Sequence, residues 1–128
     1  MNVRSAGTQN VVEGMHKHGV RRVVVQTTYG VGETRDRLPA KWRIIFSLLL
    51  KPQIADTEKQ ERVVRDSGLD WTIVQPVGLT NDRDTKPVLV STTGETRGMA
   101  VSRKSVARVL ADAIEESKYV RKCIAVSE

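Results

Sequence analysis

The chain has 128 residues, of which 39% are hydrophobic and only 4% aromatic, and its formal net charge is +6. This length suits one domain with a largely aliphatic core, and the charge favours anionic partners such as a nucleotide phosphate. The single cysteine, Cys123, excludes an intrachain disulfide and a cysteine metal cluster. Residues Met1 to Ser5 carry no apolar signal core, so we expect a cytoplasmic chain. We also expect no bound metal.

The first segment predicts a helix followed by a buried strand. Helical spacing runs from Arg4 to His18, with Ser5 as the expected amino-terminal cap and Gly19 at the carboxyl end. Residues 21–28 then read as a strand with a fully apolar centre. A charged, glycine-containing loop over residues 29–37 is expected to follow.

A second helix is predicted over residues 38–50, because aromatic and aliphatic side chains recur there at helical spacing. Lys51-Pro52 is its expected stop. Its apolar run from Ile44 to Leu50 is interrupted by Ser47 and is much shorter than the roughly 20 residues that span a bilayer. We therefore expect a soluble chain with no membrane partner.

A third helix is predicted over residues 53–67. It contains the pairs Glu58/Arg62 and Glu61/Arg65, each four residues apart and each worth about 0.3–0.5 kcal/mol on an exposed helix. We interpret these four side chains as a solvated face of the helix rather than as a site.

The third helix leads into the central strand of the chain. Gly68 suits the left-handed position that closes many helices. Residues 71–75 are apolar on both faces around Thr72-Ile73-Val74, which is typical of a parallel strand covered by helices. Pro76 then ends the strand. Ligands of open α/β sheets bind at such carboxyl ends.

The remaining chain predicts further short elements. A polar loop over residues 81–84 precedes a short strand at 88–90 and a turn at 94–98. Ser102 is expected to cap a last helix, and residues 123–126 form a last strand. Because helices alternate with strands, we predict right-handed crossovers and an α/β fold with a parallel sheet.

Four segments carry a specific family pattern: Gly7–Val12 with Gly19–Val24, Tyr29–Gly32, Gln60–Leu79 and Ser102–Ala107. Together they resemble the atypical short-chain dehydrogenase/reductase family, in its NmrA-like and biliverdin/flavin-reductase-like branch. The resemblance implies a partial Rossmann-like sheet, made of the family's carboxyl-terminal strands with flanking helices.

The glycine pattern departs from that family. No G-x-G-x-x-G occurs, and Gly30-Val31-Gly32 follows the wrong strand to hold a pyrophosphate. We therefore expect residues 1–128 to form a single partial NAD(P)-binding domain that lacks the amino-terminal glycine-rich βαβ unit. The resemblance implies NADP or NAD as the cofactor and leaves binding by this chain alone to be tested.

The proton-transferring residues of the family are not recognisable either. Neither Tyr29 nor Tyr119 is followed by lysine four residues later. Thr57 stands where the branch often has His or Lys, four residues before Glu61, and Gln75 stands where relatives usually have arginine. No catalytic residue is assigned, and whether the chain is an enzyme is left open.

The resemblance nevertheless implies which residues contact the cofactor. It implies that Thr27 and Thr28 lie beside the nicotinamide ribose and that Tyr29 forms a pocket wall. The floor beneath the ring would be formed by Gln75, Pro76, Val77 and Gly78. The alternative is structural: polar β-branched residues also end strands, and a loop tyrosine is often half-buried.

Two functions follow from these patterns. The first is an oxidoreductase whose complete fold passes hydride from NAD(P)H to a flavin, a quinone or another small-molecule substrate. The alternative is a non-catalytic regulatory or interaction module.

The partners expected from the sequence follow from its edge strand and its charge. An exposed edge of the Val23–Gln26 strand would favour a homo-oligomer or a partner chain. A nucleic-acid partner is not expected, because the basic residues 35–43 have little aromatic interleaving.

Overall fold

A computed structural model describes residues 2–83 and 86–128, so Met1 and the last residue of the expected polar loop, Asp84, lie outside the described part. The elements in chain order are α1 (Val3–His18), β1 (Arg22–Gln26), the 3-10 helix η1 (Gly32–Arg37), α2 (Ala40–Leu49), α3 (Lys51–Arg65), β2 (Asp70–Pro76), β3 (Gly78–Thr80), β4 (Leu89–Ser91), β5 (Ala100–Ser102), α4 (Arg103–Glu115), the 3-10 helix η2 (Ser117–Tyr119) and β6 (Lys122–Ser127). None of the described helices has the length and apolarity needed to cross a bilayer.

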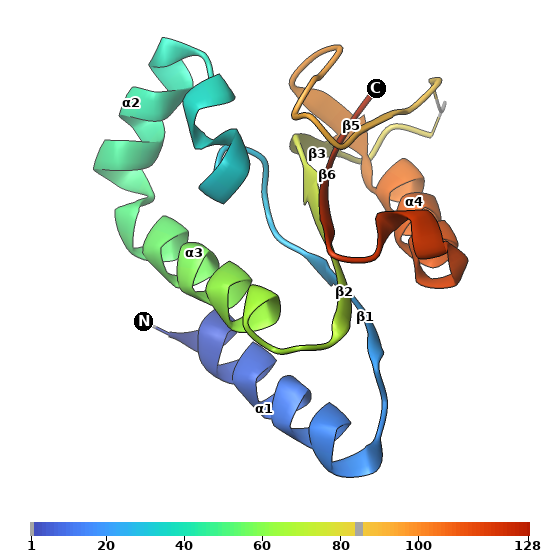
Figure 1. Ribbon diagram of the computed structural model, residues 1–128. Helices are drawn as coiled ribbons and strands as arrows, with labels where there is room; N and C mark the ends of the chain where they lie inside the picture. Colours follow the sequence, from blue (N-terminus) through green and yellow to red (C-terminus); the bar gives the residue numbers. More distant parts are fainter. Residues whose placement is uncertain (1, 84–85) are drawn as a thin grey trace.

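The main sheet has the strand order β1-β2-β6-β4. Figure 1 labels three of these strands, β1, β2 and β6. β1 and β2 run parallel with Val25 opposite Ile73, and β2 and β6 run parallel with Ile73 opposite Cys123. This confirms the predicted α/β fold with a Rossmann-like parallel sheet. Among the described residues β1 is an edge strand, and pairing with another chain there stays a prediction.

The direction of β4 is the exception to the predicted parallel arrangement of the sheet. Leu89 lies opposite Ser127 in an antiparallel pair of β4 and β6. The described residues between β2 and β4, 77–83 and 86–88, contain no helix. Parallel neighbours need a long crossover, usually a helix. Without such a crossover, β4 begins at the end of the sheet where β2 finishes, and it runs in the opposite direction to β2 and β6.

Both faces of the sheet are covered, as the apolar strands predict. On one face Trp71 and Ile73 pack with Val64 of α3. On the other face Val74 packs with Val106 of α4. Figure 1 shows α1 and α3 on one side of the strands and α4 on the other. Successive strand residues therefore belong to two separate clusters, which is the period of two of a β-strand.

The start of α1 is capped by a different residue from the one predicted. Ser5 lies inside the helix, and its hydroxyl donates to Oδ1 of Asp56 on α3 at 2.6 Å. The same carboxylate accepts the backbone N–H groups of Arg4 at 2.9 Å and Ser5 at 3.1 Å. These bonds, with that of the Ser5 hydroxyl first, keep the pKa of Asp56 low. The carboxylate thus takes the place of a local cap.

The junction of α2 and α3 also differs from the prediction. α2 ends at Leu49 and α3 already begins at Lys51, so Pro52 lies in the first turn of α3 instead of marking the stop of α2. A first-turn proline loses no helical hydrogen bond, because its N–H would have no partner inside the helix. The two helices are therefore joined by a bend at Leu50.

Two other predicted helix ends are confirmed. Gly19 closes α1 with a φ of +69°, in the left-handed region that favours glycine. Gly68 has the predicted left-handed φ of +72°, but α3 already ends at Arg65 with Asp66 as its cap, so Gly68 lies in the turn to β2. The hydroxyl of Ser102 accepts the backbone N–H of Ser105 at 3.1 Å and so caps α4.

Candidate functional site

A cleft of about 300 Å³ opens at the carboxyl ends of β1 and β2. Six of the seven predicted site residues line it, namely Thr27, Thr28, Tyr29, Pro76, Val77 and Gly78. Backbone bonds hold the two strand ends together: Thr27 N–H donates to the Val74 carbonyl at 2.9 Å, and Tyr29 N–H donates to the Pro76 carbonyl at 3.0 Å. The structure thus brings together residues that lie about fifty positions apart in the sequence.

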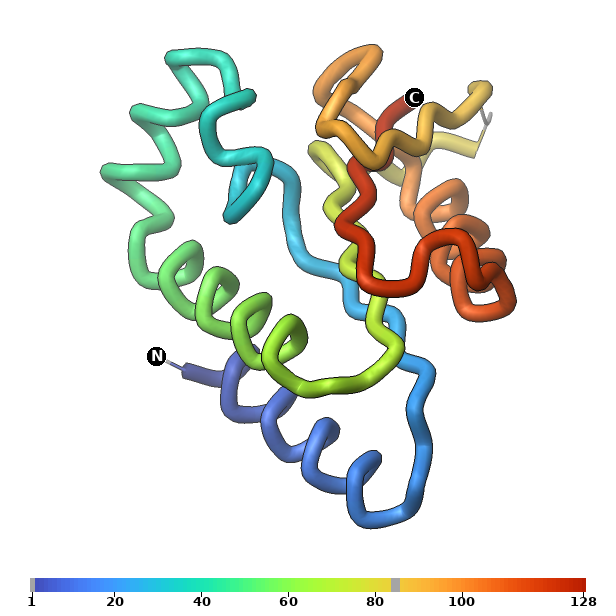
Figure 2. Tube along the Cα trace, viewed as in Figure 1, coloured from blue at the N-terminus to red at the C-terminus, as the bar shows by residue number. Residues whose placement is uncertain are grey.

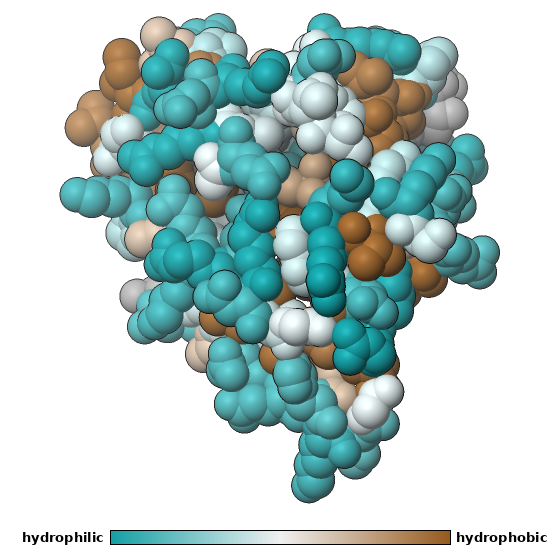
Figure 3. Space-filling view, in the orientation of Figure 1, coloured by the Kyte–Doolittle hydropathy of each residue, from teal (hydrophilic) through white to brown (hydrophobic). Residues whose placement is uncertain are grey.

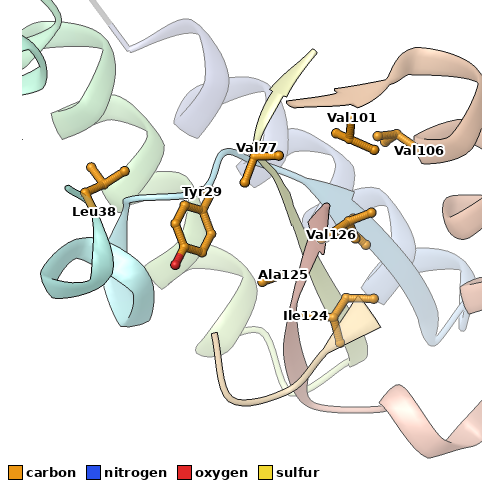
Figure 4. Packing of buried hydrophobic residues seen from close by; sticks show 9 residues of the cluster. Tyr29, Leu38, Val77, Val101, Val106, Ile124, Ala125 and Val126 are labelled. Atoms are coloured by element: carbon orange, nitrogen blue, oxygen red, sulfur yellow. The ribbon is translucent and has the colours of Figure 1, made fainter. Parts of the chain in front are cut away.

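Tyr29 is a fixed wall of this cleft. Its side chain is 3% exposed, and its hydroxyl donates to the carbonyl of Gly94 at 2.9 Å. Figure 4 shows the ring between Leu38 and the strands that carry Val77 and Ala125. Because the hydroxyl proton is already committed to a backbone carbonyl, Tyr29 offers the cleft its ring and not a proton.

Gly78 has a structural reason to lack a side chain. A Cβ at this position would lie 2.8 Å from the carbonyl oxygen of Met99, which also accepts the Gly78 N–H at 3.0 Å. This close approach belongs to the two-stranded sheet of β3 and β5, which the sequence patterns did not predict. The glycine therefore does not by itself indicate a ligand.

The far wall of the cleft comes from elements that were not predicted to contribute. Trp42 and Phe46 of α2 and Met99 supply apolar surface, and Arg103 lies at the start of α4. Arg103 is the one charged side chain among the described residues that line the cleft, and its Nη1 donates to Asn81 Oδ1 at 2.7 Å. The cleft is therefore apolar with a single exposed cation.

Behind the cleft lies a buried carboxylate, Glu61 of α3, which is 3% exposed. Its Oε2 accepts the hydroxyl of Thr27 at 2.6 Å and an Nε2 hydrogen of Gln75 at 2.8 Å. Since the only hydrogen of the Thr27 hydroxyl points to the carboxylate, Thr27 presents lone pairs to the cleft. A ligand there would have to donate a hydrogen bond to it.

Gln75 is the predicted site residue that does not line the cleft. Its side chain is fully buried. It donates to the Val31 carbonyl at 2.9 Å as well as to Glu61, and its Oε1 accepts the Thr34 hydroxyl at 2.6 Å. Thr34 in turn accepts the N–H of Gly30 at 2.7 Å. These polar groups fix the loop after β1 to β2.

Gly32 is required by the same cluster. Its φ is +59°, and a Cβ built on it would lie 2.6 Å from Oε1 of Glu61. Only a glycine combines this backbone conformation with so close an approach to the carboxylate. The Gly30-Val31-Gly32 segment thus accommodates a buried acid rather than a phosphate.

The position of Glu61 corrects the interpretation of α3 as having only solvated ion pairs. Glu61 does not pair with Arg65, whose Nη2 lies 3.0 Å from Glu33 Oε1, and Glu58 lies 3.7 Å from Arg35 rather than beside Arg62. Burial raises the pKa of Glu61, opposed by the bonds from Thr27 and Gln75. A sequence signal existed: residues 54, 57, 61 and 64 share one helical stripe whose two ends are apolar.

The comparisons with known proteins show the family to which the chain belongs. The profile of a family described as NAD(P)H-binding matches residues 2–117. An uncharacterised chloroplastic protein of Arabidopsis thaliana is 29% identical over 119 residues, which are 91% of this chain and 42% of that protein.

Two solved structures share the fold. A short-chain dehydrogenase/reductase of Veillonella parvula in complex with NADP superposes with a TM-score of 0.84 at 22% identity, over 97% of this chain and 58% of that one. An anaerobillin reductase of Escherichia coli O157:H7 gives a TM-score of 0.83 at 20% identity, over 98% and 58%. The chain thus spans about half the length of the proteins it matches.

Proposed function

This chain belongs to the NAD(P)H-binding family, and from that premise we propose that it positions the nicotinamide ring of NADPH or NADH for hydride transfer to a small acceptor of the flavin or quinone class. The gathering of six predicted residues in one cleft is the observation that carries the proposal. The activity, the acceptor and the contacts of each residue with the cofactor remain part of the proposal.

The cleft fits the nicotinamide end of the cofactor. Its volume of about 300 Å³ is at the lower limit of ligand pockets, which suits one ring and its sugar. Trp42, Phe46 and Val77 offer apolar walls, and the Thr27 oxygen offers an acceptor for a ribose hydroxyl. Among the described residues no glycine-rich turn opens an α-helix, so no pyrophosphate cradle is assigned.

The bound cofactor supplies the hydride, and this chain supplies position and environment. The apolar walls exclude water from the ring faces, and Thr27 orients the ribose because Glu61 fixes its hydroxyl. Arg103 lies where it can meet an anionic group of the acceptor. With the Tyr29 hydroxyl bound to Gly94, we assign the proton of the reduced acceptor to water at the open side of the cleft.

Equilibrium titration with NADPH tests the first step. We expect saturable binding with a Kd below about 100 μM, on the scale where 1 μM is roughly −8 kcal/mol. Leu79→Trp fills the cleft from a residue that is 37% exposed and should weaken binding at least about tenfold. Ile114→Trp, at an exposed position on α4 outside the cleft, is the matched control and should leave the affinity unchanged.

Turnover is tested by the loss of NADPH absorbance with flavin mononucleotide or a benzoquinone as acceptor. Oxidation that Leu79→Trp abolishes would support the proposal. Binding without oxidation of NADPH by either acceptor would contradict hydride transfer and favour the regulatory alternative. Equal affinities for NADPH in the Leu79→Trp variant and the unchanged chain would mean that the cofactor binds outside the cleft.

A further inference from the structure

The carboxyl-terminal part of α2 exposes a group of large aliphatic side chains. Ile44, Leu48 and Leu49 are 59%, 76% and 71% exposed, and Leu50 after the helix is 38% exposed. None of the residues of α2 is fully buried. Figure 3 shows brown, hydrophobic side chains over α2 at the upper left of the molecule. We call these four residues the α2 patch.

The α2 patch is a cluster, unlike the other exposed hydrophobic residues. Nine large hydrophobic residues are exposed among those described, and four of them fall within the seven positions of Ile44–Leu50. The others are spread over α1, the turn after it, β3 and α4. Scattered apolar residues are normal on protein surfaces, whereas a contiguous group marks an interaction site.

The charged residues of α2 and of the position directly after Leu50 are all basic, and the acidic residues near them, Asp36 and Glu58, share a pocket with Arg43 and Lys51. Lys41, Arg43 and Lys51 are exposed and flank the patch, and no Asp or Glu occurs between Arg37 and Gln53. Lys41, Ile44 and Leu48 follow the spacing of one helical stripe, so cations and aliphatic groups share a face. A basic helix with an exposed apolar face is typical of segments that lie in the interface of an anionic membrane.

The same helix also walls the candidate cleft. Trp42 and Phe46, on the inner face of α2, pack against the core and line the cleft. Figures 1 and 2 show α2 at the outer margin of the molecule, away from the sheet. A surface that covers the α2 patch would therefore lie directly beside the cleft.

We propose that α2 docks this chain onto a phospholipid surface that carries anionic headgroups. Leu48, Leu49 and Ile44 enter the boundary between headgroups and acyl chains, and Lys41, Arg43 and Lys51 contact lipid phosphates. The shortness of the apolar run, from which we expected no membrane partner, excludes a span but has no bearing on a helix that lies in the interface. An apolar acceptor dissolved in the bilayer would then reach the cleft along α2.

Flotation of the purified chain with vesicles, without any cofactor, tests the docking independently of the proposed function. We expect binding to phosphatidylcholine vesicles in which about one third of the lipid is phosphatidylglycerol, and at least about tenfold weaker binding to phosphatidylcholine alone. Raising the salt to about 0.5 M should weaken the binding, because phosphates and cations are then screened.

Two pairs of variants separate the patch from general effects. Leu48→Asp with Leu49→Asp should weaken binding at least about tenfold, since both groups would leave water on docking, whereas Ile114→Asp on α4 should not. Lys41→Glu with Lys51→Glu should weaken binding, whereas Lys17→Glu with Lys59→Glu, which changes the net charge equally at exposed positions, should not.

An Ile44→Trp variant gives a further readout should the aspartate variants fail to fold. Lipids brominated on their acyl chains should quench the added tryptophan, because residue 44 is exposed in the α2 patch, whereas Trp42 packs against the core. The proposal is overturned by absence of flotation with anionic vesicles or by equal loss in patch and control variants. It is also overturned by a lipid-free dimer that the aspartates at 48 and 49 dissociate, since a second copy would then cover the patch.

Discussion

Two regions meet at the carboxyl end of β2 and differ in what their polar groups do. On one side, Glu61 and Gln75 are buried and their polar atoms bind one another and the loop after β1. On the other side, beginning one residue later, Pro76 to Gly78 line an open, apolar cleft. Among the residues that the structure describes, Thr27 alone belongs to both regions, because it lines the cleft and donates to Glu61. The buried cluster thus serves as a rigid support for a site that is itself left open.

The largest expected effect comes from breaking the support at Glu61. Glu61→Ala removes the acceptor of the fully buried Gln75 amide and of the half-buried Thr27 hydroxyl, and it should lower the free energy of unfolding by about 3 kcal/mol, measured by urea denaturation. Glu61→Gln keeps an acceptor and should cost about 1 kcal/mol. Glu58→Ala on the same helix removes a partly exposed pair and should cost less than about 0.5 kcal/mol. Similar losses for Glu61→Ala and Glu58→Ala would show that the cluster does not stabilise the fold.

A smaller effect is expected from crowding the cluster at Gly32. Gly32→Ala combines a φ of +59° with a Cβ directed at Glu61 Oε1 and should cost about 2 kcal/mol. Gly68→Ala is the matched control, because its φ is +72° and no atom lies within 4 Å of the added Cβ. That variant should cost only about 1 kcal/mol, again by urea denaturation. An equal cost for the two variants would mean that the carboxylate moves freely.

The pH dependence of stability sharpens the comparison further. Burial raises the pKa of Glu61 above its ordinary value of 4.5, so the folded chain holds this proton more tightly than the unfolded chain. As the pH rises from 4.5 through the raised pKa, this contribution to stability is lost. The free energy of unfolding of the wild type minus that of Glu61→Gln should therefore fall over this window. A difference that stays constant, or rises, would contradict the assigned direction of the shift.

The smallest effect is expected on the open side, at Arg103. Its side chain is exposed, so Arg103→Ala should leave the urea midpoint unchanged. It should raise the KM for flavin mononucleotide about threefold, as expected for an exposed charge, and leave the KM for uncharged riboflavin unaltered. Lys104→Ala, one residue further along α4, serves as the control and should change neither value. Equal effects on both flavins would exclude recognition of the phosphate by Arg103.

The elements that were predicted well depend on nearby residues. The strands around Val24, Ile73 and Ile124 were recognisable because their side chains are apolar on both faces, which requires helices on both sides of a sheet. Gly19 fixes the end of α1, and Gly68 the turn after α3, by their own backbone freedom. Six of the seven predicted site residues lie together, since the carboxyl ends of adjacent parallel strands share one edge. Their contacts with a cofactor stay a prediction.

What the sequence by itself determined, then, is the class of fold and the edge at which the cleft opens, because both follow from local periodicity. Only the tertiary structure decided that Glu61 is buried, that Gln75 faces it instead of the cleft, and that Asp56 replaces Ser5 as the cap of α1. The hydrogen bond between Ser5 and Asp56 joins residues 51 positions apart. The environment of a polar side chain is set by such distant partners. The stripe of residues 54, 57, 61 and 64 indicates that Glu61 faces inward, but it does not specify the groups that Glu61 meets there.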